Sequence, residues 1–264
     1  MATIPNQSTT TTTSASVGFV QNKLQASRYE FKYVINAQMV RPIYEFVRCY
    51  LEPDQFTPDG LTLGYPVHSL YLDSADYHTC RATLHGDKNR FKLRVRFYDD
   101  DPSHPVFFEI KRRESTVILK QRAMVHRRFA EDLINGGPPD MSQLVKQDIK
   151  SWKALYDFCH LRDTLVARPA AYTSYMRAGY EPPFGNSVRV TFDQSIRAGK
   201  YTGQLSAMDV NGWPLIDVPG VVLELKFTDR FPNWMHVLTE TFDLMRGSMP
   251  KYVECLTLLN HVGD

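Results

Sequence analysis

The stretch RFKLRVRFYD, residues 90–99, decides the fold because basic and apolar residues alternate along it. The basic residues occupy every second position, and they are Arg90, Lys92, Arg94 and Arg96. Large apolar residues fill the positions between them. Successive side chains of a β-strand point to opposite faces of its sheet. The stretch therefore predicts a strand with one apolar face, which the rest of the protein must cover, and one cationic face.

The same alternation continues in other segments of the chain. Strand-like segments lie at residues 28–35, 68–73, 105–113, 117–125, 170–180, 187–193 and 220–229. In most of them one parity is apolar and the other carries mainly Lys and Arg, with few acidic residues: Glu30, Glu109, Asp193 and Glu224. The short polar linker DDDPSHP, residues 99–105, favours an antiparallel hairpin between the strands that flank it.

Two arrangements of this sheet would explain its cationic face. An open antiparallel sheet with one face in water is the simpler arrangement. A solvated face usually mixes both charges, however, whereas here bases dominate in strands from the whole length of the chain. Closing the sheet into a barrel would bring these bases into one lumen, where their mutual repulsion is tolerated because a polyanion binds. We therefore expect a polyanion-binding tunnel.

The residue types in this lumen indicate phosphate as the ligand. Arginine makes planar, bidentate contacts with phosphate oxygens, and lysine adds compact point charges. A few carboxylates among the bases fit Mg2+ or Mn2+, because such an ion is commonly held by one or two carboxylates together with substrate phosphates. The expected ligand is a chain of phosphates with a metal ion.

Helical periodicity distinguishes three further segments. Residues 36–51, capped by Asn36, and residues 140–161 are each predicted to form an amphipathic helix, and residues 233–245 a third. The Ser/Thr-rich residues 1–22 are predicted to be disordered. Residues 23–264 contain no linker that would divide them, so we expect a single tunnel domain.

The overall composition limits the classes of partner and the compartment. The 264 residues carry a net charge of only +2, which argues against indiscriminate nucleic-acid binding. Aromatic residues fall mostly on the apolar parity, which argues against RNA. The four widely spaced cysteines are typical of reduced, mostly buried thiols in a cytoplasmic protein. No segment has the length of a membrane span or the pattern of a signal peptide, so we expect a cytoplasmic protein.

A family resemblance adds to this interpretation. It is carried by motifs in a fixed order: RYEFKY, YLD, KLRVR, FEIKRR, LKQR, YMR, RVTFD, LELKF and SMPKY. Over roughly residues 27–258 the chain resembles the VTC domain, the polyphosphate polymerase domain of the vacuolar transporter chaperone complex and its bacterial relatives, in the triphosphate tunnel metalloenzyme or CYTH-like superfamily. The resemblance implies an α+β fold in which an antiparallel, roughly eight-stranded β-barrel tunnel is flanked by helices, here as a stand-alone bacterial-type member.

The resemblance also implies roles for individual residues. The residues expected to act on the phosphates in catalysis are Lys32, Arg94, Arg96, Lys111, Lys120, Arg177 and Arg189. Further substrate-binding cations, from the alternating pattern and the family's C-terminal lysine, are Arg90, Lys92, Arg113, Arg122, Lys226 and Lys251. The expected ligands of an Mn2+ or Mg2+ cofactor are Glu224, Glu30 and Glu109.

The first strand departs from the pattern of the tunnel triphosphatases. Those enzymes carry ExExK there, whereas this chain has Arg28, Glu30 and Lys32 at the corresponding positions. One carboxylate is missing, which favours one metal ion over two and fits the VTC branch. The eukaryotic complex also has a sensing domain and membrane helices, to which nothing in this sequence corresponds. Regulation and export therefore cannot be transferred from that complex to this chain, and the sequence leaves open a membrane partner that would receive the product for export.

The leading functional hypothesis is an enzyme that transfers the γ-phosphate of ATP to a growing inorganic polyphosphate chain and releases ADP. One alternative is a tunnel triphosphatase, in which water is the acceptor and inorganic or nucleoside triphosphate is the substrate. The other is a module that binds polyphosphate or another polyanion without catalysis. ATP and inorganic polyphosphate are the expected partners, nucleic acid is not, and the sequence leaves the oligomeric state open.

Overall fold

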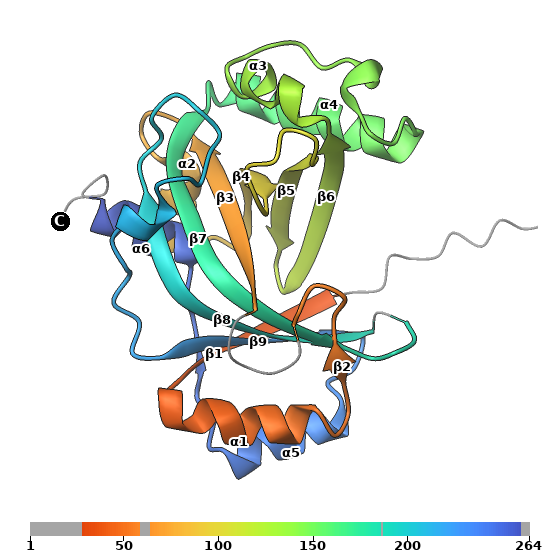
Figure 1. Cartoon of the computed structure of the whole chain (residues 1–264), viewed down its shortest axis with the longest axis vertical. Coiled ribbons are helices and arrows are strands. Elements are labelled where there is room, and N and C mark those ends of the chain that lie inside the picture. The colour runs from red at the N-terminus through yellow and green to blue at the C-terminus, as the bar shows by residue number, and fades with distance from the viewer. Residues whose placement is uncertain (1–27, 59–63, 186, 260–264) are drawn as a thin grey trace, which may run out of the picture.

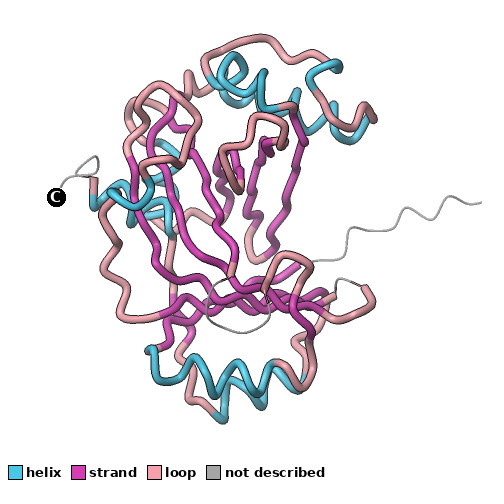
Figure 2. Tube along the Cα trace, in the orientation of Figure 1, coloured by secondary structure: helices cyan, strands magenta, loops and turns pink. Residues whose placement is uncertain are grey.

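A strongly curved antiparallel sheet with helices on its outer side forms the body of the protein (Figures 1 and 2). The computed structural model describes residues 28–58, 64–185 and 187–259. The predicted disordered segment 1–22 lies outside these residues, as do the first residues of the predicted domain. The α+β class and the antiparallel sheet flanked by helices are confirmed.

In the described part of the chain the sheet has ten strands, nine of which follow one path. Their order across the sheet is β10 (Arg246–Gly247), β1 (Arg28–Ile35), β9 (Val221–Thr228), β8 (Val188–Gly199), β7 (Arg168–Glu181), β3 (Tyr65–Asp73), β4 (Asn89–Phe97), β5 (Val106–Glu114) and β6 (Val117–Val125). The short β2 (Glu52–Pro53) pairs with β7 beside this path. Each strand-like segment predicted from the sequence overlaps one of these strands, although the predicted stretches 90–99 and 220–229 extend one or two residues beyond β4 and β9.

The register of β4 explains the alternation that opened the sequence. Arg96 lies opposite Ser69 of β3, and Arg94 lies opposite Glu109 of β5. The other parity, including Leu93 and Val95, is fully buried in a core cluster on the opposite face of the sheet. The predicted hairpin between β4 and β5 is confirmed by this antiparallel ladder. One face of the strand therefore belongs to the core, and the other faces the concave side of the sheet.

The curved sheet is not closed by backbone pairing, which corrects the idea of a continuous barrel. Within the described residues no ladder joins β6 to β1. The reason is that β1, already paired with β9, pairs through its other edge with β10, where Lys32 lies opposite Gly247. The two strands still lie close together, and Lys111 of β5 donates to the carboxylate of Glu30 of β1 at 3.0 Å. Side chains thus complete the tunnel wall.

Two helices pack on the β1–β9–β8 part of the sheet (Figure 1). Helix α1 (Ala37–Val47) begins after Asn36, whose side chain accepts a hydrogen bond from the Met39 N–H at 3.0 Å, as predicted. It ends at Val47, four residues before the predicted end at residue 51. Helix α5 (Asn233–Thr241) packs beside it and likewise ends before its predicted limit, residue 245.

The β4–β5–β6 part of the sheet is covered by α3 (Ala130–Ile134) and α4 (Ile149–Thr164). The helix predicted over 140–161 begins only at Ile149. The predicted segment contains two N-terminal caps. Asp140 caps a separate 3₁₀ turn, Met141–Gln143, whereas Asp148 caps α4 and accepts a hydrogen bond from the Ser151 N–H at 2.7 Å. Further 3₁₀ turns lie at Arg127–Phe129 and Val210–Gly212.

The third group of helices, α2 (His78–Leu84) and α6 (Lys251–Leu258), packs beside β3, β7 and β8. The sequence predicted neither helix. Among the described residues no helix combines the length and the apolar character needed to cross a membrane. Three of the four cysteines are buried free thiols, and Cys49 is an exposed one.

Asp73, at the end of β3, ties both of these helices to the sheet. Its carboxylate is 2% exposed and accepts hydrogen bonds from the N–H and the hydroxyl of Thr79, from the Cys80 N–H and from the Tyr252 hydroxyl, at 2.8–3.1 Å. Asp73→Ala would leave these donors buried without an acceptor. We expect urea unfolding to show a loss of about 3 kcal/mol in the free energy of unfolding.

Asp76→Ala is the matched control. Asp76 lies three residues along the chain, and its ion pair with Arg81 is half exposed on both sides. An exposed pair of this kind contributes less than about 1 kcal/mol. Equal urea midpoints for the two variants would show that the Asp73 hydrogen bonds do not anchor the helices.

Candidate functional site

The concave side of the sheet encloses a cavity of about 680 Å³. All of the predicted site residues except Glu109 line it: Glu30, Lys32, Arg90, Lys92, Arg94, Arg96, Lys111, Arg113, Lys120, Arg122, Arg177, Arg189, Glu224, Lys226 and Lys251. Among the described lining residues only Glu30 and Glu224 are acidic. The cavity is therefore a strongly cationic tunnel whose walls come from residues far apart in the sequence.

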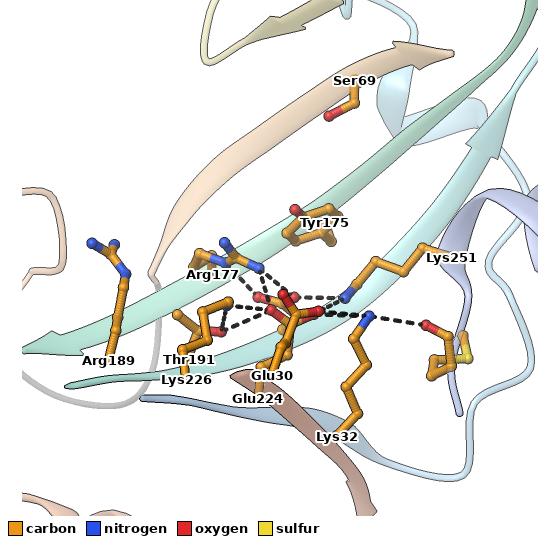
Figure 3. A network of polar contacts seen from close by, with 12 residues as sticks. Glu30, Lys32, Ser69, Tyr175, Arg177, Arg189, Thr191, Glu224, Lys226 and Lys251 are labelled. Carbon is orange, nitrogen blue, oxygen red and sulfur yellow. Dashed lines mark hydrogen bonds and ion pairs between the residues drawn. The ribbon is translucent and has the colours of Figure 1, made fainter. Parts of the chain in front are cut away.

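Glu224 lies at the centre of a network of polar contacts on the concave side of the sheet (Figure 3). Its carboxylate lies 3.1 Å from the ammonium of Lys251, 3.3 Å from that of Lys32 and 3.3 Å from the guanidinium of Arg177, and it also pairs with Lys226. Burial would raise the pKa of Glu224, but these cations hold it well below its ordinary value. The anionic side chain thus gathers four bases from three strands and helix α6 at one point.

Asp193 fixes Arg177 beside this centre. It is fully buried, and its two oxygens accept from Nε and Nη2 of Arg177 at 2.6 and 2.7 Å. Lys251 also pairs with it at 2.7 Å. This bidentate contact holds the guanidinium plane rigidly against the tunnel. The sequence placed Asp193 on the charged parity but gave it no role.

Glu109 holds a second group of bases, and its surroundings do not fit the predicted role of metal ligand. Its side chain is 0% exposed and does not line the cavity. Its oxygens pair with Arg94, Lys120 and Arg122, the first two at 2.6 and 2.7 Å. A metal ion would have to displace all three cations to reach it. Glu109 thus faces the concave side of the sheet but lies beneath the three bases that it holds, and we omit it from the metal ligands.

Arg96 differs from these bases because it has no carboxylate partner among the described residues. It is 6% exposed, and its guanidinium donates to the hydroxyls of Ser69 and Tyr175 at 3.3 and 3.2 Å. Two neutral acceptors orient the group, and Glu109 attracts it only from beyond ion-pair distance. Burying a cation without an ion-pair partner costs free energy. An anionic ligand bound beside Arg96 would therefore stabilise its charge.

Lys92 is a second base without an acidic partner in the described part of the chain. Its ammonium lies 5.6 Å from the ring centroid of Tyr252. Burial, followed by repulsion from Lys32 and Lys111, lowers the pKa of Lys92 to about 7. Its charge therefore changes near neutral pH.

This titration predicts a pH effect on anion binding. Lys92 is charged below its pKa of about 7 and neutral above it, so the affinity for inorganic tripolyphosphate should fall as pH rises through that value. Calorimetry on the wild type and Lys92→Arg tests this, because arginine stays protonated and the ligand's own titration is common to both. As pH rises through this value, we expect the affinity of the wild type to fall by a factor about five times larger than that of Lys92→Arg. Identical pH profiles would exclude Lys92 as the titrating group.

The ends of the tunnel carry the remaining predicted bases. Arg90 lies opposite Arg113 in the β4–β5 ladder, and burial together with Arg113 lowers the pKa of Arg90. At the other end Arg189 pairs with Asp54 and, at 2.8 Å, with Glu181. The structure thus distributes the predicted cations along the whole tunnel.

The residues present fit a divalent cation only together with phosphate. No group of three or more His, Cys, Asp or Glu side chains among the described residues forms a ready-made metal site. Glu30 and Glu224 both line the tunnel, and both pair with Lys32. Mg2+ commonly takes one or two carboxylates and completes its shell with substrate phosphates. Glu30 and Glu224 can supply these one or two carboxylates.

Sequence reasoning missed part of the tunnel lining. The missed residues include Phe56, Tyr65, Tyr71, Tyr98, Tyr175, Arg246 and Tyr252. The period-two run of Tyr65, Val67, Ser69 and Tyr71 on β3 could have indicated one shared face. Arg246 lies in a two-residue strand, for which no periodicity exists.

Comparison with known proteins gives one family match and several distant structural similarities. The family model described as the VTC domain matches residues 27–260. A search of curated proteins finds no match. Similar solved structures are a candidate adenylate cyclase from Bacillus halodurans (12% identity, TM-score 0.48, 85% of this chain and 94% of that chain) and the PH1819 protein of Pyrococcus horikoshii (13%, 0.41, 89% and 99%). A third is the mimivirus capping enzyme triphosphatase (12%, 0.35, 82% and 87%).

Proposed function

The chain belongs to the VTC domain family, and from this premise we propose that it is a metal-dependent polyphosphate polymerase. The reaction transfers the γ-phosphate of ATP to the end of an inorganic polyphosphate chain and releases ADP. It would take place in the cytoplasm, where ATP is available. The observation that carries the proposal is the tunnel itself, in which cations from β1, β4, β5, β6, β7, β8, β9 and α6 face one cavity with two acidic lining residues.

The shape and charge of this cavity suit a linear polyanion. Arg96 and Lys92, which have no acidic partner in the described part of the chain, lie on the same face of β4. Arg94 lies between them on that face, held by Glu109. The spacing of alternate residues in a strand, roughly 7 Å, lets successive side chains contact successive parts of an extended chain of phosphates. A compact anion would leave most of these bases without a ligand.

The transfer needs positioning and charge neutralisation more than covalent chemistry. A terminal phosphate oxygen of the chain, already anionic, forms a bond to the γ-phosphorus. The bond from that phosphorus to the β,γ-bridging oxygen breaks, and its electron pair leaves with ADP. Arg96, Arg94 and Arg177 would hold the equatorial oxygens as negative charge moves between them. Mn2+ or Mg2+, held by Glu224 and Glu30, would supply further neutralisation.

The two lining carboxylates are poor candidates for a general base that would activate water for hydrolysis. Hydrolysis requires activation of water by a base or a metal ion. Burial raises the pKa of Glu30, but Lys111 and Lys32 lower it below its ordinary value, and Glu224 is likewise held ionised. Carboxylates stabilised in this way are weak bases. The transfer to polyphosphate requires no such base.

Incubation of the purified protein with ATP and Mn2+ or Mg2+, with and without a short polyphosphate primer, tests the proposal. Long-chain phosphate should appear in step with ADP. Free phosphate without chains would instead support the triphosphatase. Tight polyphosphate binding without any turnover would support the binding module.

A further inference from the structure

Alternate side chains of β3 support the bases of β4, the strand that pairs with it. Arg96 lies opposite Ser69, whose hydroxyl accepts a hydrogen bond from its Nε at 3.3 Å. Arg94 lies opposite Tyr71, whose hydroxyl accepts a hydrogen bond from its Nη1 at 3.3 Å. Strand β3 thus gives each of these two arginines a neutral acceptor on the same side of the sheet.

The third position of this series breaks the pattern. The same register, continued by one residue, sets Asp73 of β3 opposite Lys92 of β4. A carboxylate beside a lysine would normally form an ion pair, but none joins these two within the described residues. Instead the Asp73 carboxylate, which is 2% exposed, accepts hydrogen bonds from Thr79, Cys80 and the Tyr252 hydroxyl. Lys92 therefore lacks the partner that its position in the sheet would provide.

Tyr252 contacts both members of this separated pair. It is the second residue of α6, it is 1% exposed, and it lines the cavity. Its hydroxyl donates to Asp73 at 2.8 Å, while the ammonium of Lys92 lies over its ring, 5.6 Å from the centroid. The ring also stacks on that of Tyr71, with centroids 4.5 Å apart. A hydrogen bond and a stacking contact therefore fix the orientation of the ring beside the lysine.

We propose that Tyr252 is a positioning residue of the tunnel, whose ring holds the Lys92 ammonium toward the bound chain of phosphates. This inference rests on the proposed function, because it requires that phosphates bind in the tunnel. The electron-rich face of an aromatic ring attracts a cation but carries no net charge. The ring can therefore hold Lys92 without neutralising it, as a carboxylate would. Asp73 acts one step further away, because its contact is with the Tyr252 hydroxyl.

A double-mutant cycle separates this role from mere packing. The affinity for inorganic tripolyphosphate is measured by calorimetry at neutral pH for the wild type, Tyr252→Leu, Lys92→Met and the double variant. Loss of the ring should weaken binding about fivefold in the presence of Lys92. In the Lys92→Met background the same change should weaken binding less than about twofold, because the lysine on which the ring acts is absent. Tyr252→Met is a second variant without a ring, should Tyr252→Leu fail to fold.

Two further variants complete the design. Tyr252→Phe keeps the ring and should retain most of the wild-type affinity. Leu256→Ala is the control for a general loosening of α6, since Leu256 is fully buried in the same helix and does not line the cavity. It should lower the unfolding temperature and leave the affinity unchanged.

Three results would overturn the inference. They are equal losses on removal of the ring with and without Lys92, a loss in Tyr252→Phe as large as in Tyr252→Leu, and a comparable loss in Leu256→Ala. The outcome is separable from the proposed function, because the binding measurements involve no turnover. The expected coupling in a protein that makes no chains would retain the role of Tyr252 and refute the polymerase, whereas chain synthesis without the coupling would do the reverse.

Discussion

Replacement of Arg96 by methionine is expected to reduce chain synthesis on the order of a hundredfold or more. Arg96 is a buried guanidinium oriented by Ser69 and Tyr175, and no described carboxylate forms an ion pair with it. Its charge is therefore available to the transferring phosphoryl group. Methionine keeps the unbranched stem of the side chain without the guanidinium, and it leaves no acidic group unpaired. Initial rates of ADP release and of chain formation measure the effect.

Arg96→Lys is the matched variant for this prediction. Lysine keeps the positive charge but lacks the planar fork that can hold two phosphate oxygens. Its rate should lie between those of the wild type and Arg96→Met. Wild-type turnover in Arg96→Met, with an unchanged unfolding temperature, would show that the guanidinium does not act on the phosphates.

Replacement of Glu224 by glutamine should have opposite effects on catalysis and on anion binding. The carboxylate holds Lys32, Arg177, Lys226 and Lys251 together, and breaking a buried charge cluster of this kind costs about 3 kcal/mol of the free energy of unfolding. Chain synthesis should fall on the order of a hundredfold, because a metal-holding group is lost. Polyphosphate should bind more tightly, and its addition should restore the unfolding temperature without restoring turnover.

The pH dependence of this stability difference has a definite sign. Because the pKa of Glu224 in the folded protein lies below its unfolded value, the carboxylate stabilises the fold above the unfolded pKa and loses that effect as pH falls. The wild type and Glu224→Gln should therefore converge in stability in acid. Glu45→Gln is the control, since Glu45 pairs with Arg48 at an exposed site on α1 and should change neither property. Equal stability of Glu224→Gln and the wild type at neutral pH would contradict the role of Glu224.

The sequence predicted the strands and the orientation of their side chains well. In β4 the pattern of period two requires that Leu93 and Val95 face the core once Arg94 and Arg96 face the cavity. A strand has only two faces, so alternation determines orientation without knowledge of neighbouring strands. The same reasoning placed Glu224 on the cavity side of β9.

Features that depend on depth and on neighbouring strands could not be predicted in this way. Glu109 has the same parity as Lys111 and faces the same side of the sheet, yet paired bases cover its carboxylate while Lys111 lines the cavity. The open edge between β6 and β1 depends on the two-residue strand β10, for which the sequence has no signal. Two lining residues that the sequence did not predict, Phe56 from a loop and Tyr98 just after β4, stack on each other, and no local period joins them.

The most direct test of the central claim follows the γ-phosphorus of ATP. Purified protein is incubated with ATP labelled at the γ-position, a polyphosphate primer and Mn2+ or Mg2+, and the label is located after separation of polymer, nucleotide and free phosphate. The account predicts that the label enters the polymer, with one ADP formed for each phosphate added, and that Arg96→Met loses both products together. Label recovered as free phosphate, with no labelled polymer, would contradict it.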